Sequence, residues 1–213
     1  MVNDKQIKVI FFDIGDVLLK IHPERMISKI SSCANIPYEV VERAFPQNAH
    51  DAYERGKMTD YDWYMSCKTA LPKNNSLSED QFWESWSLLL GNETEVVDIL
   101  INLKKNYKIW LLSNTNPMHI KNEIESKYVF QKLVDGGIYS YDVGYRKPEK
   151  EIYHIACDSA EVNPENSIFI DDLEENIIGA NKVGIKGIHY KNTIELLKEL
   201  TRLNINHDKK SNL

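Results

Sequence analysis

Short apolar segments that alternate with helical segments constrain the fold of this chain more than any other feature. Runs rich in β-branched and aromatic residues, with the length of strands, lie at 7–12, 108–113, 136–140, 167–171 and 185–190. Helical patterns lie between them, most clearly at 93–105, 117–127, 148–158 and 174–183. Because strands that alternate with helices form a parallel sheet covered on both faces, the pattern predicts an α/β fold with a doubly wound parallel sheet.

One long segment interrupts this alternation after the first strand. Residues 22–91 contain helical patterns and no convincing strand. The expected helices lie at 23–34, 37–45, 48–56, 59–71 and 78–90. Thr59 and Ser78 are the expected N-caps of the last two helices, since each is followed three residues later by an acidic or amide side chain. The sequence therefore predicts an α-helical cap inserted at 22–91.

The segments on either side of the cap are expected to form one Rossmann-like core, 1–21 together with 92–203. A chain of 213 residues is long enough for one full domain and a smaller insertion. Residues 204–213 have the polar sequence NINHDKKSNL, which is typical of a flexible tail.

Charge, cysteine content and hydropathy exclude several classes of protein. The net charge of −6 and the lack of a basic stripe argue against a nucleic-acid partner. The three cysteines are widely spaced, which favours reduced thiols over a disulfide framework or a metal knot. No apolar run reaches the ~20 residues that cross a bilayer, and the N-terminus lacks a signal-peptide pattern. We expect a soluble, cytoplasmic protein with no membrane partner; its oligomeric state is not readable from the sequence.

Polar residues follow the predicted strands where ligands bind in a doubly wound sheet, beyond the carboxyl ends of the strands. They are Asp13 after the first strand, Ser113 and Asn114 at the second, Lys147 after the third, and Asp171 and Asp172 at the fourth. Aspartates gathered at one place repel one another, and a hard divalent cation bound by oxygen ligands relieves that repulsion. The acid cluster therefore predicts Mg²⁺ as the cofactor.

The same residues could hold a phosphate monoester beside such a cation. Lys147, the Ser113 hydroxyl and Asn114 offer contacts from different sides, and free N–H groups of the helix that begins near Pro117 could face the phosphate. Phosphoryl transfer depends mainly on positioning and charge neutralisation. A carboxylate nucleophile would form an aspartyl-phosphate that water then hydrolyses.

Five segments carry a resemblance to a known family. In chain order they are FFDIGDVLL, AYERGKMT, LLSNTNPMH, DVGYRKPEKEIY and FIDDLEENIIGAN. In this order, with a helical cap after the first, the chain resembles the haloacid dehalogenase superfamily over nearly its whole length. More narrowly, it is similar to the branch that contains bacterial α-D-glucose-1-phosphate phosphatases and the phosphatase domain of soluble epoxide hydrolase.

The resemblance implies a role for each matching residue. The implied catalytic group consists of Asp13 as nucleophile, Lys147, which neutralises charge, and Ser113. Phosphate would be bound by Ser113, Asn114 and Lys147. The implied metal ligands are Asp13, Asp172, Asp171 directly or through water, and the backbone carbonyl of Gly15.

One position departs from the family pattern. Most phosphatases of this superfamily carry a second Asp two residues after the nucleophile, as general acid and base, and this chain has Gly15 there. The neighbouring Asp16 points elsewhere on a turn and is interpreted as structural. Since general acid–base help is worth ~10²–10⁴-fold in rate, the loss predicts a slower enzyme. The alternative is a phosphate-binding or regulatory protein that turns over weakly or not at all.

Two further residues are candidates for substrate binding, His22 at the junction of core and cap and Arg55 in a cap turn. Hinge packing for His22 and a surface ion pair for Arg55 are the alternative interpretations. His119 could touch the entrance of the site, and Asn176 is expected to stabilise the loop after the fourth strand.

The predicted function is Mg²⁺-dependent hydrolysis of a small phosphorylated metabolite, with a sugar phosphate such as glucose 1-phosphate favoured by resemblance. A helical cap that closes over the site favours small substrates. Two alternatives fit less well. A signalling receiver domain carries its acid pair near the first strand and has no large insertion. Carbon–halogen hydrolysis needs no divalent metal, whereas the acid pair beside Lys147 suits Mg²⁺ and phosphate.

Overall fold

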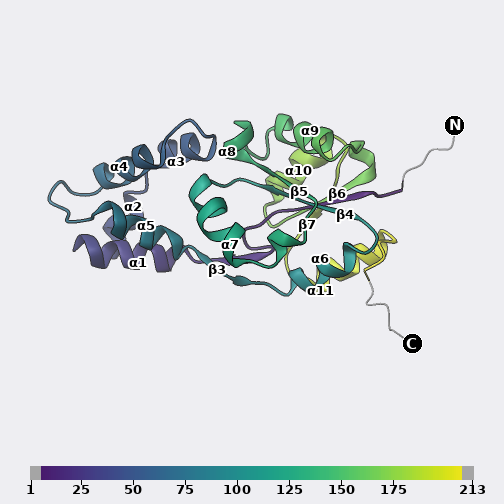
Figure 1. Ribbon diagram of the computed structural model, residues 1–213, viewed down its shortest axis with the longest axis horizontal. Coiled ribbons are helices and arrows are strands. Elements are labelled where there is room, and N and C mark those ends of the chain that lie inside the picture. The colour runs from purple at the N-terminus through teal and green to yellow at the C-terminus, as the bar shows by residue number, and fades with distance from the viewer. Residues whose placement is uncertain (1–5, 208–213) are drawn as a thin grey trace.

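The computed structural model describes residues 6–207, and a parallel five-stranded sheet lies at its centre (Figure 1). The strand order is β5-β4-β1-β6-β7. The strands are β1 (Val9–Phe12), β4 (Lys108–Ser113), β5 (Gly136–Tyr139), β6 (Ser167–Asp171) and β7 (Lys186–His189). All four pairings in this sheet are parallel, so the carboxyl ends of the strands lie along one edge. The α/β fold and the five predicted strands are confirmed.

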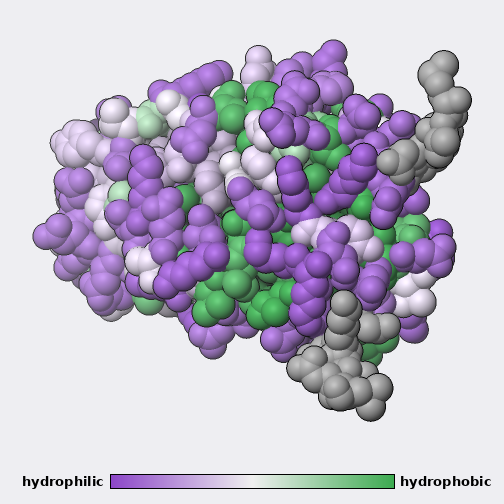
Figure 2. Space-filling view, turned by 45° about the vertical axis from the view of Figure 1, so that its right-hand side comes forward, coloured by the Kyte–Doolittle hydropathy of each residue, from purple (hydrophilic) through white to green (hydrophobic). Residues whose placement is uncertain are grey.

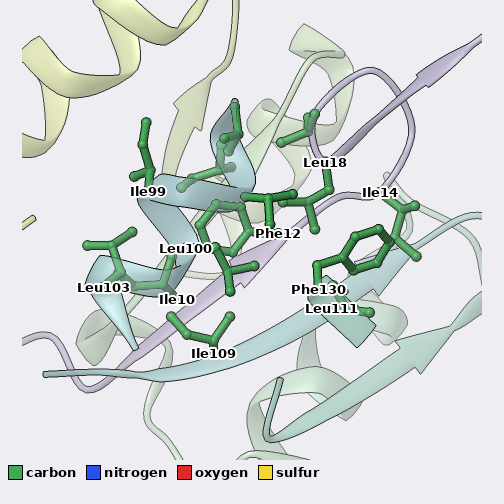
Figure 3. Packing of buried hydrophobic residues seen from close by; sticks show 14 of the residues in the cluster. Ile10, Phe12, Ile14, Leu18, Ile99, Leu100, Leu103, Ile109, Leu111 and Phe130 are labelled. Atoms are coloured by element: carbon green, nitrogen blue, oxygen red, sulfur yellow. The ribbon is translucent and has the colours of Figure 1, made fainter. Parts of the chain in front are cut away.

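Helices cover both faces of this sheet (Figure 1). One face packs against α6 (Val96–Leu103) and α11 (Thr193–Arg202), and the other against α9 (Lys150–Ser159) and α10 (Glu174–Lys182). Alternate side chains of β1 pack on opposite faces of the sheet, because successive side chains of a strand point in opposite directions. Ile10 and Phe12 pack toward Leu100 of α6 (Figure 3), whereas Phe11 packs on the opposite face.

Shorter helices lie in the segments that connect these layers. They are the π-helix Met118–Ile124 with α7 (Glu125–Lys127), the 3₁₀ helices Phe130–Lys132 and Pro164–Asn166, and α8 (Ser140–Val143). The helix expected at 117–127 is thus largely π-helical, a form that is often found at functional sites.

Five helices between the first and second core strands form a layer of their own at one end of the molecule (Figure 1). They are α1 (Pro23–Ala34), α2 (Tyr38–Arg43), α3 (Gln47–Glu54), α4 (Asp60–Ala70) and α5 (Glu79–Ser87). A separate hydrophobic cluster holds them together. Thr59 accepts from the backbone N–H of Asp62 at 3.1 Å, and Ser78 accepts from that of Gln81 at 3.3 Å. The two predicted N-caps are therefore present.

A short antiparallel pair joins these helices to the sheet region. It consists of β2 (Leu19–Ile21) and β3 (Leu90–Glu93), where the chain leaves the core and returns to it. The sequence prediction was wrong here: it recognised neither strand and extended the last cap helix to residue 90. Segments of three and four residues, one of them with Gly91 and Asn92, are too short to show alternation. The division into core and cap at 22–91 stays a prediction.

The end of the chain packs closely as far as Ile205, which is 5% exposed and belongs to the hydrophobic cluster beneath α6 and α11. This residue lies inside the segment expected to be a tail, of which residues 208–213 fall outside the described part. Figure 2 shows a mostly hydrophilic face with smaller hydrophobic areas between the polar residues. Within residues 6–207, no helix is long and apolar enough to cross a lipid bilayer.

Candidate active site

The predicted site residues come together at the carboxyl edge of the sheet. Asp13 follows β1, Ser113 ends β4 and Asp171 ends β6. Because β1 lies between β4 and β6, these three positions are neighbours. A pocket of about 380 Å³ opens at this edge, and its lining includes Asp13, Gly15, Ser113, Asn114, Lys147 and Asp172.

Lys147 is the electrostatic centre of this site. Its Nζ atom lies 2.7 Å from an Asp13 carboxylate oxygen and 2.7 Å from an Asp171 oxygen, and it donates to the backbone carbonyl of Leu112 at 2.9 Å. The whole residue is 4% exposed. Burial alone would lower the pKa of Lys147, but the two carboxylates outweigh burial and raise it. Lys147 therefore remains a cation inside the protein.

The aspartates carry more negative charge than this one cation balances. Burial, reinforced by repulsion from Asp171, raises the pKa of Asp13 to about 7 although Lys147 opposes the shift. Burial and then Asp171 also raise the pKa of Asp172. One carboxylate oxygen from each of the three aspartates lies within 4.8 Å of the others. Such a hard oxygen donor set fits Mg²⁺, whose bound charge would favour the ionised carboxylates.

Asp171 is held more firmly than the other two aspartates. Its Oδ1 accepts from the backbone N–H of Leu173 at 2.8 Å, and both carboxylate oxygens accept from the Asn176 amide at 3.0 Å. With Lys147 on Oδ2, each oxygen already accepts two hydrogen bonds. Asn176 stabilises the loop after β6, as the sequence predicted, and it does so by fixing the Asp171 carboxylate.

Asn114 holds the segment that carries Lys147. Its side-chain amide donates to the Lys147 backbone carbonyl at 3.0 Å, and its amide oxygen accepts from the Lys147 backbone N–H at 2.8 Å. Ser113 is buried beside it and makes part of the pocket wall. The geometry thus gives Asn114 a positioning contact in addition to its place in the pocket; its expected contact with phosphate stays a prediction.

His119 forms part of the pocket wall rather than an exposed entrance. Its ring stacks on Trp86 of α5 at 5.2 Å between centroids. Nδ1 accepts from the Asn116 amide at 3.1 Å, which leaves Nε2 to donate to the Trp86 carbonyl at 3.3 Å. Burial lowers the pKa of His119 to about 4, so the ring is neutral at physiological pH.

Helix α3 contributes residues to the pocket that sequence reasoning missed. His50 and Glu54 line it from the cap, together with Arg146 from the segment before α9. The Arg146 guanidinium lies 2.8 Å from Glu54, and the His50 ring lies 3.5 Å from the same carboxylate. The four-residue spacing of His50 and Glu54 places both on one helix face, and this was the available sequence signal.

Neither further candidate for substrate binding lines the pocket. His22 pairs with Glu24 at 2.9 Å and lies at the start of α1. Arg55 donates to Glu149 from its two terminal guanidinium nitrogens, Nη1 and Nη2, at 2.9 and 2.6 Å, and so joins the end of α3 to the segment before α9. Their predicted contact with substrate stays untested, and both positions agree with the alternative structural interpretations.

Gly15 and Asp16 lie in the turn that follows Asp13, and their surroundings differ. A Cβ at Gly15 would lie 3.3 Å from the Ile21 side chain and near nothing else. Asp16 has a left-handed backbone, with φ of 50°, and its carboxylate accepts from the backbone N–H of Ile21 at 3.4 Å. Asp16 therefore stabilises the turn, although it also lines the pocket.

An open parallel sheet with an acid cluster and a buried lysine at its carboxyl edge, beneath a helical layer, is typical of Rossmann-like enzymes that transfer phosphoryl groups. The family model for haloacid dehalogenase-like hydrolases matches residues 7–184, and the chain belongs to this family. The resemblance seen in the sequence motifs is thereby confirmed.

Proteins with assigned activities resemble the chain over most of its length. D-ribitol-5-phosphate phosphatase from Bacteroides thetaiotaomicron is 23% identical, covering 92% of this chain and 97% of the relative. Sesquiterpene phosphatase astK from Aspergillus oryzae is 24% identical, covering 92% of this chain and 96% of the relative. A haloacid dehalogenase family enzyme from B. thetaiotaomicron, solved with magnesium and inorganic phosphate, superposes with a TM-score of 0.77 at 26% identity, over 88% of this chain and 96% of that one.

Proposed function

We propose that this protein is a Mg²⁺-dependent phosphatase that hydrolyses a small phosphate monoester through an aspartyl-phosphate at Asp13. The observation that carries the proposal is the arrangement of Asp13, Lys147 and Asp171, in which one buried ammonium group lies 2.7 Å from both carboxylates. Asp172 lines the same pocket and completes a donor set for a divalent cation.

The residues that would hold Mg²⁺ are Asp13, Asp172 and the backbone carbonyl of Gly15. Asp171 would act through a bound water, because both of its oxygens already accept two hydrogen bonds. When bound, Mg²⁺ neutralises charge on the phosphate and keeps Asp13 ionised.

Asp13 then attacks phosphorus with one carboxylate oxygen while the alcohol leaves from the opposite side. Lys147 and the Ser113 hydroxyl stabilise the charge on the phosphoryl oxygens, and Asn114 holds the backbone of Lys147 in place. Water hydrolyses the aspartyl-phosphate, which returns the carboxylate and releases inorganic phosphate. In the absence of an acid at Gly15, the leaving group takes its proton from water, which slows the reaction.

The names of the relatives support a phosphate monoester as the substrate class. One relative is named for ribitol 5-phosphate and another for sesquiterpene phosphates, so their leaving groups differ in polarity. A pocket of about 380 Å³ suits a small molecule better than a phosphoprotein. Glucose 1-phosphate, favoured by the sequence resemblance, is one candidate within this class.

A phosphate-release screen tests the proposal. Purified protein is incubated with sugar, polyol, nucleotide and alkyl phosphates, with Mg²⁺ or with excess chelator. We expect phosphate release that needs Mg²⁺ and is abolished in Asp13→Asn, whereas Asp16→Asn in the adjoining turn retains most of it. Tight phosphate-ester binding without turnover would favour the phosphate-binding alternative, and chelator-insensitive release of halide from haloacids would favour dehalogenation.

A further inference from the structure

A second cavity lies inside the cap. Its volume is about 330 Å³. The lining is drawn from all five cap helices and the segments that connect them, with His50 as the residue from α3, and it is almost entirely apolar. Among the lining residues are Met26, Ile30, Ala44, Leu71, Leu77 and Phe82. Besides His50, two residues of the lining can carry charge, Glu42 and Cys67. Glu42 is exposed to solvent, and burial raises the pKa of the Cys67 thiol, so the thiol is neutral.

This cap cavity adjoins the catalytic pocket. His50, Trp86 and Leu89 line both of them, so these three residues form the shared boundary. Burial lowers the pKa of His50, which makes its ring neutral at physiological pH. The boundary between the cap cavity and the catalytic pocket therefore consists of two hydrophobic side chains and an uncharged ring.

The cavity is unusual because the cap packs tightly right beside it. Tyr53 stacks on Trp63 at 5.4 Å between centroids, and Phe82 stacks on Trp86 at 5.8 Å. Protein interiors are close-packed and keep few voids larger than a water molecule. The space reaches the protein surface, because Glu42 and Phe45 of its lining are exposed. It has the dimensions of a small-molecule site, and an apolar ligand that covers its walls removes them from water.

We propose that the cap cavity binds the aliphatic tail of a phosphate monoester whose phosphate lies against Asp13. This inference rests on the proposed function and narrows it to substrates with an apolar leaving group. A dry apolar cavity of roughly 150 Å³ holds benzene, so about 330 Å³ accommodates a chain on the order of ten carbons. A sugar that entered this cavity would leave its hydroxyl groups without hydrogen-bond partners.

Chain-length dependence is the first test. The enzyme is assayed with Mg²⁺ and straight-chain alkyl phosphates from ethyl to dodecyl, with glucose 1-phosphate and ribitol 5-phosphate for comparison. We expect kcat/KM to rise roughly fourfold per methylene, since each buried methylene contributes a constant transfer free energy, and to level off near decyl phosphate. Equal kcat/KM for ethyl and decyl phosphate would overturn the tail site while leaving the phosphatase function intact.

Matched variants locate the tail. Ala44 lines the cavity at the end of α2, and Ala70, at the end of α4, lines a different surface depression. Ala44→Phe is expected to lower kcat/KM for decyl phosphate at least tenfold and to leave kcat/KM for ethyl phosphate unchanged. Ala70→Phe is expected to change neither value. Ile27→Ala, which enlarges the cavity, is expected to move the preferred chain toward dodecyl. Equal effects of Ala44→Phe and Ala70→Phe would contradict the assignment.

Calorimetry with decylphosphonate separates the two proposals, because this probe cannot be hydrolysed at its phosphorus–carbon bond. If no phosphate ester is turned over, the proposed function fails, and binding still tests the cavity. We expect decylphosphonate to bind at least tenfold more tightly to the wild type than to Ala44→Phe, and ethylphosphonate to show no such difference. Absence of decylphosphonate binding, or binding that Ala44→Phe does not weaken, would overturn the tail site.

Discussion

Lys147 and Asp13 form a buried ion pair, with Nζ 2.7 Å from the Asp13 carboxylate. The same nitrogen contacts Asp171 at an equal distance, so a single cation links the ends of β1 and β6. This arrangement places positive charge where a transferred phosphoryl group would meet its nucleophile.

Removal of the Lys147 charge tests this arrangement. Lys147→Met is expected to lower kcat for phosphate release by ~10²–10³-fold at saturating Mg²⁺, the cost of losing one preorganised donor to the transition state. Lys150→Met is the matched control, since Lys150 is exposed at the start of α9. Circular dichroism checks that both variants are folded. Comparable kcat values for the two variants would contradict a catalytic role of Lys147.

Gly15 offers a gain-of-function test. Only the flexible side chain of Ile21 lies within reach of a Cβ at this position, so Asp fits with a small adjustment. Gly15→Asp is expected to raise kcat by up to ~10²-fold, because it supplies a general acid for the leaving group. Gly15→Asn has nearly the same shape and no transferable proton, so it should give no increase. The ratio of the two kcat values is the measurement, and a ratio near one would contradict the interpretation.

The contact between α3 and α8 depends on Gly56. This residue has φ of +66°, and a Cβ there would overlap the backbone oxygen of Tyr141. We expect Gly56→Ala to separate the cap from the core and to lower kcat/KM by on the order of tenfold, mainly through KM. Gly184→Ala introduces the same kind of left-handed strain, at φ of +95°, away from the cap and with room for a Cβ. It should lower thermal stability and leave KM unchanged.

Buried His119 makes stability fall in acid. Its pKa is about 4 in the folded protein against an ordinary value of 6.5, so the unfolded chain binds a proton first as the pH falls. The stabilisation is complete above about pH 6.5 and is lost as the pH falls toward 4. Between pH 7 and pH 5 this residue should lower the free energy of unfolding by roughly 2 kcal/mol.

Urea denaturation of the wild type and His119→Gln at both pH values measures this effect. We expect the variant to be less stable at pH 7 and its free energy of unfolding to fall less between pH 7 and pH 5. The comparison separates His119 from other titrating groups, among them Asp13, whose raised pKa acts in the opposite direction. Identical pH dependence in the two proteins would show that folding leaves the pKa of His119 unchanged, and would contradict this prediction.

The parts of the fold that were predictable are those fixed by local patterns. Buried strands, helix periodicity and N-caps such as Thr59 act within a few residues, and parallel pairing then brings Asp13 and Asp171 together. β2 and β3 escaped prediction because they are stabilised by each other across the cap, and neither is long enough to show a period.

The rest of the site depends on long-range packing. His50 and Glu54 reach the pocket because α3 packs near α8 and meets Arg146, which is ninety-two residues beyond Glu54. No local pattern records that contact. The cap cavity is likewise a property of five packed helices, and in the sequence its lining is indistinguishable from ordinary hydrophobic core.

Chemical trapping of phosphorylated Asp13 tests the nucleophile most directly. The protein is mixed with Mg²⁺ and a phosphate ester that it is found to hydrolyse, and the reaction is quenched in acid. The protein is then digested, and the phosphorylated peptide is identified by mass spectrometry. We predict an acyl phosphate on Asp13 in the wild type, absent in Asp13→Asn and present in Asp16→Asn. Phosphate on another residue, or an undiminished signal in Asp13→Asn, would contradict the assignment of Asp13 as the nucleophile.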